Sequence, residues 1–186
     1  MKQIIEEQVL VYEQVQLDRW KAGDKSLIPN FIEMHGDYFN QHSYHFGEIF
    51  VITTFNRLYG WKGFRFYALG TWEPNNHKYE KSREMITKLF PTEKLVKFRD
   101  ARREQDKVSG TGEPDVMLYN DQGGTLFLEV KKGSDRISDA QLTCLAQIRS
   151  ILDTEVGIIY LKEARQKYNP KRYELDLAKH CGKLLD

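Results

Sequence analysis

With 186 residues, the chain is long enough for one domain or for one domain with an elaboration, and 40% hydrophobic and 12% aromatic residues suffice for a real core. The formal net charge of +1 excludes bulk attraction to nucleic acid, so any basic surface must be local. The N-terminus carries glutamates in place of a signal sequence, and no apolar run approaches the roughly 18 residues of a membrane span. These features predict a soluble cytoplasmic protein without a membrane segment, with the nucleoid or the nucleus as alternative locations.

The first 41 residues are predicted to form a helical extension. Residues 2–21 place apolar side chains in a broad stripe among glutamates and glutamines, a pattern typical of a packing or dimer helix. Residues 22–30 contain a glycine and a proline and are predicted as a connection. Residues 31–39 are predicted as a second, short helix. No candidate chemistry is identified in the first helix.

Residues 42–59 form the next predicted helix, because phenylalanine and isoleucine recur there at helical spacing. Glu48 lies within this otherwise apolar pattern. It belongs either to the exposed stripe of the helix or to a site at the end of a following sheet. Glu33 is a weaker candidate for the same role.

Two pairs of residues have side chains that metals prefer. His42 and His45 are three positions apart, which is the spacing of a metal pair, but no cysteine or third histidine lies nearby. Cys144 and Cys181 fit no metal or redox spacing and are predicted to be reduced, structural thiols.

The remainder of the chain is predicted to alternate strands and helices. The expected elements are a strand at 64–69, helices at 78–90 and 92–105, strands at 115–120 and 125–131, a helix at 138–152, a strand at 155–161 and a last helix from Asn169. With residues 71–111 taken as a helical insertion, the order from residue 42 is helix, three strands, helix, strand. We expect one domain covering residues 1–186.

The insertion is more basic than the rest of the chain. Residues 76–107 contain ten Lys or Arg against six Asp or Glu, a local balance of +4. They form either solvated helix surfaces or an arm that contacts phosphates, because Lys and Arg provide most non-specific affinity for nucleic acids. Arg99, Arg102 and Arg103 are the preferred contacts.

The stretch from Gly112 to Gln141 carries the candidate chemistry. Asp115 begins one predicted strand, and Glu129 and Lys131 lie near the end of the next. Alternate side chains of a strand point to opposite faces, so Glu129 and Lys131 share a face. Two carboxylates and an ammonium at the end of a sheet can hold a divalent metal and activate a water beside it. A Glu-x-Lys triplet alone is more often a solvated strand edge. Here the preceding aspartate and the apolar strand favour a functional site.

The segment resembles the PD-(D/E)XK nuclease motif, specifically its VRR-NUC branch, which reads roughly Gly-x-Pro-Asp, a strand, Glu-Val-Lys and Gly-x-Asp-Arg-x-Ser-x-x-Gln. The matching residues are Gly112, Pro114, Asp115, Glu129, Val130, Lys131, Gly133, Asp135, Arg136, Ser138 and Gln141. The chain departs from the branch at Lys132, where glycine is more usual, and this leaves the local loop shape open.

The resemblance implies a fold and a metal. The fold is α/β, with a restriction-endonuclease-like αβββαβ core whose mixed central sheet is flanked by helices. The implied metal is Mg²⁺ or Mn²⁺, bound by the Asp115 and Glu129 carboxylates and by the Val130 carbonyl. The resemblance also favours Glu48 as an acidic residue that points into the site and could bind a second metal.

Two further residues of the motif receive roles from the resemblance. Lys131 is expected to hold or help deprotonate the attacking water. Gln141 is expected near the active-site cleft. Ser138 and Gln141 also have the Ser-x-x-Gln spacing of a helix capping box, so Gln141 has a purely structural interpretation as well.

The implied function is a metal-dependent DNA endonuclease that selects branched DNA such as a junction or a flap, with a homodimer as an option and no small-molecule cofactor. Lys132 and Arg136 join the three arginines of the insertion as expected nucleic-acid contacts. One alternative is a sequence-specific, restriction-type endonuclease, which would need a base-reading element. The other is a non-catalytic nucleic-acid-binding module, which would need a damaged triad.

The register of the predicted hairpin decides whether a shared metal site can form. If Asn120 pairs with Thr125, Asp115 falls opposite Val130 and faces away from Glu129. A register shifted by one places Asp115 opposite Glu129 or Lys131, and this requires an odd-length turn or a bulge. We therefore predict such a turn, with positive φ at Gly123 or Gly124. Asp115, Glu129 and Lys131 should converge on one face, with the side chains Leu126, Leu128 and Val130 on the other.

Overall fold

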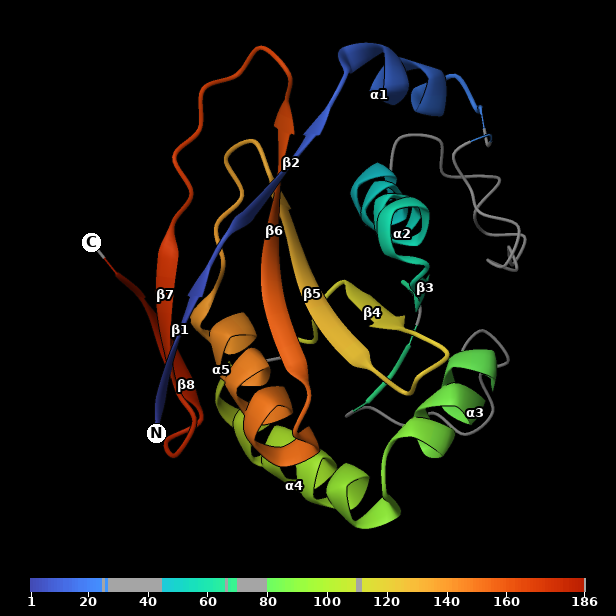
Figure 1. Cartoon of the computed structure of the whole chain (residues 1–186). Coiled ribbons are helices and arrows are strands. Elements are labelled where there is room, and N and C mark those ends of the chain that lie inside the picture. The colour runs from blue at the N-terminus through green and yellow to red at the C-terminus, as the bar shows by residue number, and fades with distance from the viewer. Residues whose placement is uncertain (25, 27–44, 66, 70–79, 110–111, 186) are drawn as a thin grey trace.

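A five-stranded mixed sheet forms the centre of the computed structural model, which describes residues 1–24, 26, 45–65, 67–69, 80–109 and 112–185 (Figure 1). The strand order is β2 (Gln8–Tyr12), β6 (Glu155–Glu163), β5 (Thr125–Lys132), β4 (Val116–Tyr119) and β3 (Lys62–Phe64). The first three strands are parallel, and β4 is antiparallel to both of its neighbours. The mixed sheet predicted for the core is confirmed.

The core elements follow one another in the predicted αβββαβ order. Helix α2 (Phe46–Tyr59) precedes β3, β4 and β5, and α5 (Asp139–Gln147) separates β5 from β6. Helices α3 (Glu80–Leu89) and α4 (Thr92–Ser109) occupy the predicted insertion. The strand expected at 64–69 is wrong in its bounds, since β3 ends at Phe64 where its pairing with β4 ends.

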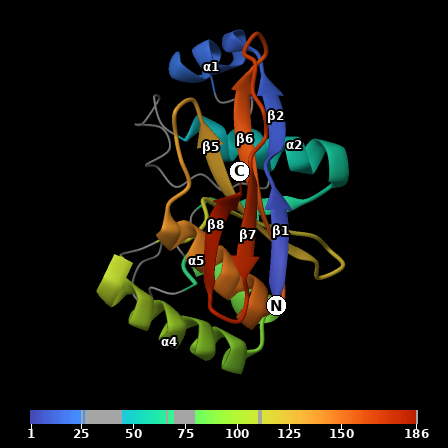
Figure 2. The same ribbon diagram turned by 90° about the vertical axis from the view of Figure 1, so that its left-hand side faces the viewer.

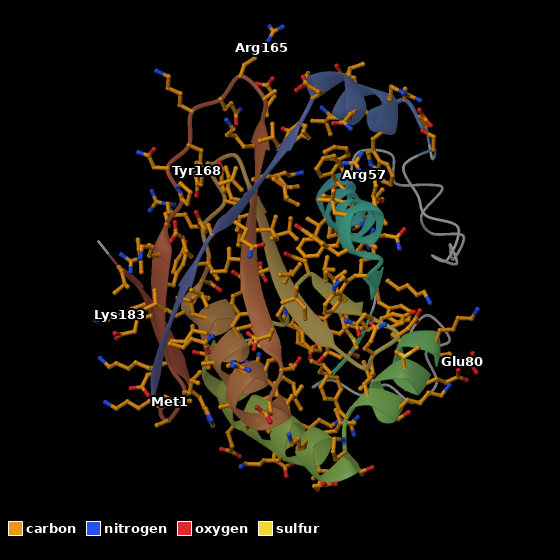
Figure 3. The ribbon with its side chains drawn as sticks, viewed as in Figure 1. Met1, Arg57, Glu80, Arg165, Tyr168 and Lys183 are labelled. Atoms are coloured by element: carbon orange, nitrogen blue, oxygen red, sulfur yellow. The ribbon has the colours of Figure 1, made fainter. Side chains whose placement is uncertain are left out.

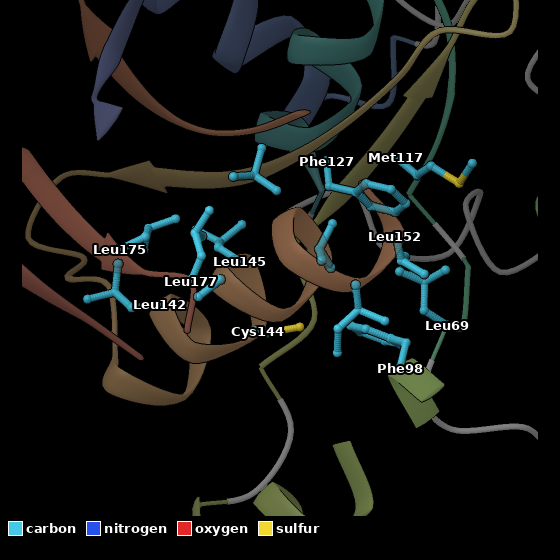
Figure 4. Packing of buried hydrophobic residues seen from close by; sticks show 14 of the residues in the cluster. Leu69, Phe98, Met117, Phe127, Leu142, Cys144, Leu145, Leu152, Leu175 and Leu177 are labelled. Atoms are coloured by element: carbon cyan, nitrogen blue, oxygen red, sulfur yellow. The ribbon is translucent and has the colours of Figure 1, made fainter. Parts of the chain in front are cut away.

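Each face of the sheet is covered by helices. On one face, α2 packs Ile49 and Ile52 against Leu118 and Leu128. On the other face, α4 and α5 meet the sheet, and Figure 4 shows part of the cluster that Phe127 and Met117 of the sheet share with Leu145 and Cys144 of α5 and Phe98 of α4. Burying one such aliphatic or aromatic side chain contributes about 1.5–3 kcal/mol, so the two layers hold the sheet between them.

The ends of the two core helices follow from local sequence. Helix α2 ends at Gly60, whose φ of 72° is the left-handed conformation common after a helix C-terminus. Helix α5 begins after Ser138 and continues into a π-helical turn (Ile148–Leu152) that ends at Asp153. The predicted helix at 138–152 is confirmed, and its π turn keeps Ile148, Ile151 and Leu152 buried.

The predicted helix at residues 2–21 is wrong for its first half. Strand β1 (Lys2–Glu6) and strand β2 come first, and only α1 (Gln14–Lys21) is helical. Figure 2 shows β1 running on into β2 in one nearly straight line. The branched residues of this stretch suit a strand, and pairing with distant strands decided the outcome. The helix predicted at 31–39, with Glu33, lies outside the described residues, as does His42.

The helix predicted from Asn169 is also wrong. Strands β7 (Arg172–Asp176) and β8 (Cys181–Leu185) form a second sheet with β1, in the order β1-β7-β8. Tyr173, Leu175 and Leu177 are buried at every second position, which is the period of a strand. Cys181 is exposed and Cys144 is buried, and neither takes part in a disulfide among the described residues. No helix among the described residues is long and apolar enough to cross a membrane.

Candidate active site

The β4–β5 hairpin has the register that the site requires. Val116 pairs with Leu128 and Tyr119 pairs with Thr125. Asn120 N donates to Gly124 O at 3.0 Å, which leaves a three-residue turn, and Gly123 has a φ of 82°. The predicted odd-length turn and positive φ are confirmed. The same register, continued by one residue, sets Asp115 opposite Glu129.

The charged and apolar side chains of β5 are sorted onto the two faces as predicted. Leu126, Leu128 and Val130 pack in the layer under α2. On the opposite face, Lys131 Nζ lies 2.7 Å from Glu129 Oε1. The backbone N–H of Val130 donates to Asp115 Oδ2 at 2.8 Å and ties the aspartate to the end of β5.

Glu129 is the centre of this cluster and is almost completely buried, with 1% of its side chain exposed. Its Oε1 accepts from Lys131 and from Gln141 Nε2, the latter at 2.5 Å. Its Oε2 is also buried and has no hydrogen-bond partner among the described residues. Burial and the nearby Asp115 charge raise the pKa of Glu129 to about 8, although Lys131 opposes this.

An oxygen in this position fits a divalent cation. A buried carboxylate oxygen without a partner is costly, and native proteins rarely leave one. Hard cations such as Mg²⁺ prefer carboxylate and carbonyl oxygens. A cation between Glu129 and Asp115 would satisfy the buried oxygen and remove the repulsion between the two carboxylates.

The pKa of Asp115 depends on burial and on the charge of a second acidic neighbour, Glu48. Burial raises its pKa, the Val130 N–H lowers it, and the charge of Glu48 raises it again, with a net rise. Glu48 therefore lies near enough to Asp115 to act on it electrostatically. Glu48 lies on α2, which covers the opposite face of the sheet, so a charge carried by α2 affects the ionisation of Asp115.

The segment before Asp115 is held in place from two sides. A Cβ on Gly112 would lie 2.6 Å from Ala140 O, so this segment runs directly against the first turn of α5 and only glycine fits. On the other side, the buried Tyr67 donates its hydroxyl hydrogen to Pro114 O. Sequence reasoning missed Tyr67, because nothing local marks an aromatic residue 47 positions from its partner as a support.

Gln141 has both of the roles considered for it. Its Oε1 accepts a hydrogen bond from Ser138 N at 2.9 Å, and its backbone N–H donates to Ser138 Oγ at 3.2 Å. These two bonds form the capping box. Gln141 Nε2 donates to Glu129. One side chain thus joins the start of α5 to the candidate active site.

Glu48 reaches the site from the first turn of α2. A Cβ on Gly47 would lie 3.3 Å from Val130 Cγ1, so the helix begins in close contact with the end of β5. Glu48 Oε1 lies 3.1 Å from His45 Nδ1. Burial raises the pKa of Glu48, but this bond and other local interactions outweigh it and the net pKa is lowered.

The structure brings Glu48 near Asp115 but does not group it with Asp115 and Glu129 as a set of three metal ligands. The described residues contain no group of three or more His, Cys, Asp or Glu side chains that could hold a metal ion. The candidate centre therefore consists of Asp115 and Glu129, with the Val130 backbone beside them. His45 is engaged with Glu48, and its proposed partner His42 is not described.

The predicted nucleic-acid contacts separate into surface and core residues. Arg103, Lys132 and Arg136 are exposed. The prediction for Arg102 is wrong, because α4 turns this residue into the core, where 2% of it is exposed and its Nη1 donates to Gln147 Oε1 at 3.2 Å. Arg99 is partly buried and donates from Nε to Leu69 O at 3.1 Å.

The loop after β5 turns at Gly133, directly after Lys132. Lys132 ends the strand, and the following Gly133 takes the left-handed conformation, with φ of 58°, that the turn needs. The hydroxyl of Tyr160 on β6 donates to Gly133 O at 2.7 Å and fixes this turn. Tyr160 was not singled out by sequence, since its contact depends on the pairing of β5 with β6.

Comparisons with known proteins assign the chain to a family. The family model of the VRR-NUC domain matches residues 64–160. No curated protein matches the chain. A similar solved structure is the crystal structure of paFAN1 bound to 2nt 5'flap DNA with gap, with 15% sequence identity and a TM-score of 0.46, covering 88% of this chain and 38% of that chain. The chain thus corresponds to well under half of that protein. Because the family match spans more than half of the chain and includes the whole Gly112–Gln141 motif, the chain belongs to the VRR-NUC domain family.

Proposed function

We propose that the protein is a metal-dependent endonuclease that hydrolyses phosphodiester bonds in DNA. Membership of the VRR-NUC domain family supports nuclease activity on DNA. The observation that carries the metal is the buried Oε2 of Glu129, which has no hydrogen-bond partner among the described residues and belongs to a carboxylate coupled to Asp115. Mg²⁺ or Mn²⁺ is the proposed ion, because both accept oxygen ligands.

The metal would be held by the carboxylates of Asp115 and Glu129 and by the carbonyl of Val130. When bound there, such an ion neutralises charge on the scissile phosphate and lowers the pKa of a bound water. The Val130 N–H already orients one oxygen of Asp115, and Gln141 orients Glu129. Glu48 adds negative charge close to Asp115 and is proposed to hold a second ion or its water shell.

Lys131 is the proposed partner of the attacking water. Its side chain is 11% exposed, against 1% for Glu129, and its ammonium is held on Glu129 Oε1, so Lys131 is the member of this pair that solvent reaches. From there it can hold a water by hydrogen bonding, help remove its proton and stabilise the negative charge that develops on the phosphate.

The proposed substrate is branched DNA, such as a flap or a junction. Members of the VRR-NUC branch include structure-selective enzymes, some of them homodimers, and a net charge of +1 favours local contacts over binding along a long duplex. A restriction-type enzyme is the second candidate among nucleases. The intact and convergent Asp115, Glu129 and Lys131 argue against a non-catalytic binding module.

Cleavage of linear duplex, flap and four-way-junction DNA in Mg²⁺, Mn²⁺ or EDTA tests the proposal. We expect cleavage with either metal and none in EDTA. Glu129→Gln keeps the shape of the side chain but removes its charge, and it should lower the cleavage rate by at least about a thousandfold. Glu93→Gln, an exposed carboxylate of α4, is the matched control and should cleave normally.

Calorimetric titration with Mn²⁺ separates metal binding from catalysis. Wild-type protein should bind the ion, and Asp115→Asn and Glu129→Gln should bind it much more weakly. Lys131→Met should retain the ion and lose cleavage. Folded Glu129→Gln protein that cleaves DNA at the wild-type rate would refute the assignment.

A further inference from the structure

Two tyrosines form a face-to-face stack next to the candidate active site. The rings of Tyr160 and Tyr168 are separated by 3.4 Å between centroids and are inclined by 2°. Tyr160 is the residue of β6 that pairs with Lys131 of β5. Tyr168 belongs to the connection between β6 and β7, as Figure 3 shows. Tyr160 is therefore the strand neighbour of Lys131, the proposed catalytic lysine, and Tyr168 is the outer ring that stacks on Tyr160.

The outer ring is held by a buried carboxylate. Tyr168 donates its hydroxyl hydrogen to Glu7 Oε2 at 2.5 Å. Glu7 is 5% exposed and also accepts from Lys171 N and from the Tyr173 hydroxyl, each at 2.9 Å. These bonds tie the β6–β7 connection to the junction of β1 and β2. Tyr168 is thus positioned before any ligand arrives.

Tyr168 is the more solvent-accessible ring of the stack. The side chain is partly exposed, whereas Tyr160 behind it is buried. A parallel stack at van der Waals distance excludes water from the inner face, so the exposed part of Tyr168 lies on its opposite face or at the ring edge. An aromatic face of this kind, backed by a second ring and fixed by its hydroxyl, is a platform for a planar group.

The chain segments that carry and adjoin this platform are rich in exposed cationic side chains. The β6–β7 connection carries exposed Arg165 and Lys167, and Arg172 follows at the start of β7. The turn held by the Tyr160 hydroxyl is flanked by exposed Lys132 and Arg136. Between residues 162 and 172 the chain has five Lys or Arg and one Glu, although the whole chain is nearly neutral.

We propose that Tyr168, stacked on Tyr160 in the same connection as the exposed Arg165 and Lys167, is a binding site for single-stranded DNA. An unpaired base stacks on the Tyr168 ring, and the two cations contact the adjacent phosphates. Stacking on aromatic side chains is tolerant of sequence, and bases within a duplex are already stacked on one another, so the site selects an unpaired strand. This inference rests on the proposed nuclease function and adds a binding site for its substrate. DNA bound at Tyr168 would place a single-stranded branch next to Lys131.

Binding of a flap and of a blunt duplex of equal length, measured by fluorescence anisotropy in EDTA, tests the site without cleavage. Tyr168→Leu should weaken flap binding roughly 5- to 150-fold, the effect of losing one base–aromatic stack, and should change duplex binding less than about twofold. Tyr168→Phe keeps the ring and should bind the flap like wild type. Tyr59→Leu is the control, because it removes an exposed tyrosine at the C-terminal end of α2, outside the proposed binding site.

Three results would overturn the proposal. They are unchanged flap binding by folded Tyr168→Leu, equal losses in Tyr168→Leu and Tyr168→Phe, and an equal loss on the flap and on the duplex. Photocrosslinking of the wild-type protein to single-stranded DNA containing 5-iodouracil gives a test that needs no variant. A crosslink at Tyr168 supports the site, and crosslinks confined to other elements contradict it.

The two proposals can fail separately. Wild-type cleavage that depends on Mg²⁺ and is lost in Glu129→Gln establishes the nuclease, whatever Tyr168 does. Selective loss of flap binding in Tyr168→Leu establishes the platform in EDTA, even if the protein cleaves nothing.

Discussion

Gln141 donates a hydrogen bond from Nε2 to Glu129 Oε1 at 2.5 Å while its own Oε1 caps the helix that follows. The side chain therefore links the position of α5 to the orientation of the buried carboxylate. Lys131 occupies the same oxygen of Glu129, so Oε2 is the oxygen left for a metal. Helix capping and the geometry of the site depend on one residue, and variants can separate the two.

Gln141→Glu should lower DNA cleavage about 10- to 100-fold with little loss of stability. Glutamate can still serve in the capping box, but it replaces the Nε2 donor with an oxygen that repels Glu129. Ser138→Ala should do the opposite, with a loss of about 1 kcal/mol in the free energy of unfolding and near-normal cleavage. Denaturant unfolding and single-turnover cleavage measure the two effects. If both variants lose activity equally, the link to Glu129 has no catalytic role.

Gly112→Ala should destabilise the protein by about 1–3 kcal/mol and also reduce cleavage. The new Cβ would collide with Ala140 O at 2.6 Å, and relieving the collision moves Asp115 away from α5. Gly123→Ala is the comparison. It strains a left-handed residue at the hairpin tip by about 1–2 kcal/mol, with no atom nearby to displace, and should leave cleavage unchanged. Normal activity in Gly112→Ala would show that the contact does not position Asp115.

Glu129→Gln should stabilise the metal-free protein at pH 8 and do so much less at pH 5. The pKa of Glu129 rises from 4.5 to about 8 on folding, so its contribution to stability is fully present below pH 4.5 and is lost as the pH rises towards 8. Glutamine does not titrate. In EDTA, the difference in unfolding free energy between variant and wild type should grow between pH 5 and pH 8 by on the order of 2–4 kcal/mol. Parallel stability curves for the two proteins would contradict the raised pKa.

Arg102→Ala should destabilise the fold by about 2–4 kcal/mol, because it leaves a cavity and removes the hydrogen bond that Arg102 donates to Gln147 Oε1 in the core. The folded variant should bind DNA like wild type. Arg103→Glu and Arg136→Glu should instead keep the melting temperature and weaken DNA binding, each reducing the slope of log affinity against log salt by about one. Melting curves and salt titrations distinguish these outcomes, and a normal salt slope in both surface variants would exclude them from the interface.

Local sequence was sufficient for the elements that carry the site. The Ser138–Gln141 spacing and Gly60 mark helix ends that the structure retains, and the apolar run before Glu129 identifies β5. The hairpin register followed from a physical requirement, since only an odd turn lets Asp115 meet Glu129, and Gly123 supplies the positive φ that such a turn needs. These features depend on residues close together in the chain, where capping, turn chemistry and side-chain alternation act directly.

Contacts between distant residues decided the rest. Residues 2–12 and 172–185 have patterns compatible with a helix or a strand, and they became strands because β2 pairs with β6 and β1 pairs with β7. Arg102 was counted as a surface cation, but the packing of α4 against α5 buried it. In the same way, Tyr160 and Tyr168 are 8 positions apart and acquire a joint role only when the β6–β7 connection folds back. Burial and strand pairing are properties of the assembled layers, so the sequence determined the chemistry of the site and the tertiary structure decided which other side chains surround it.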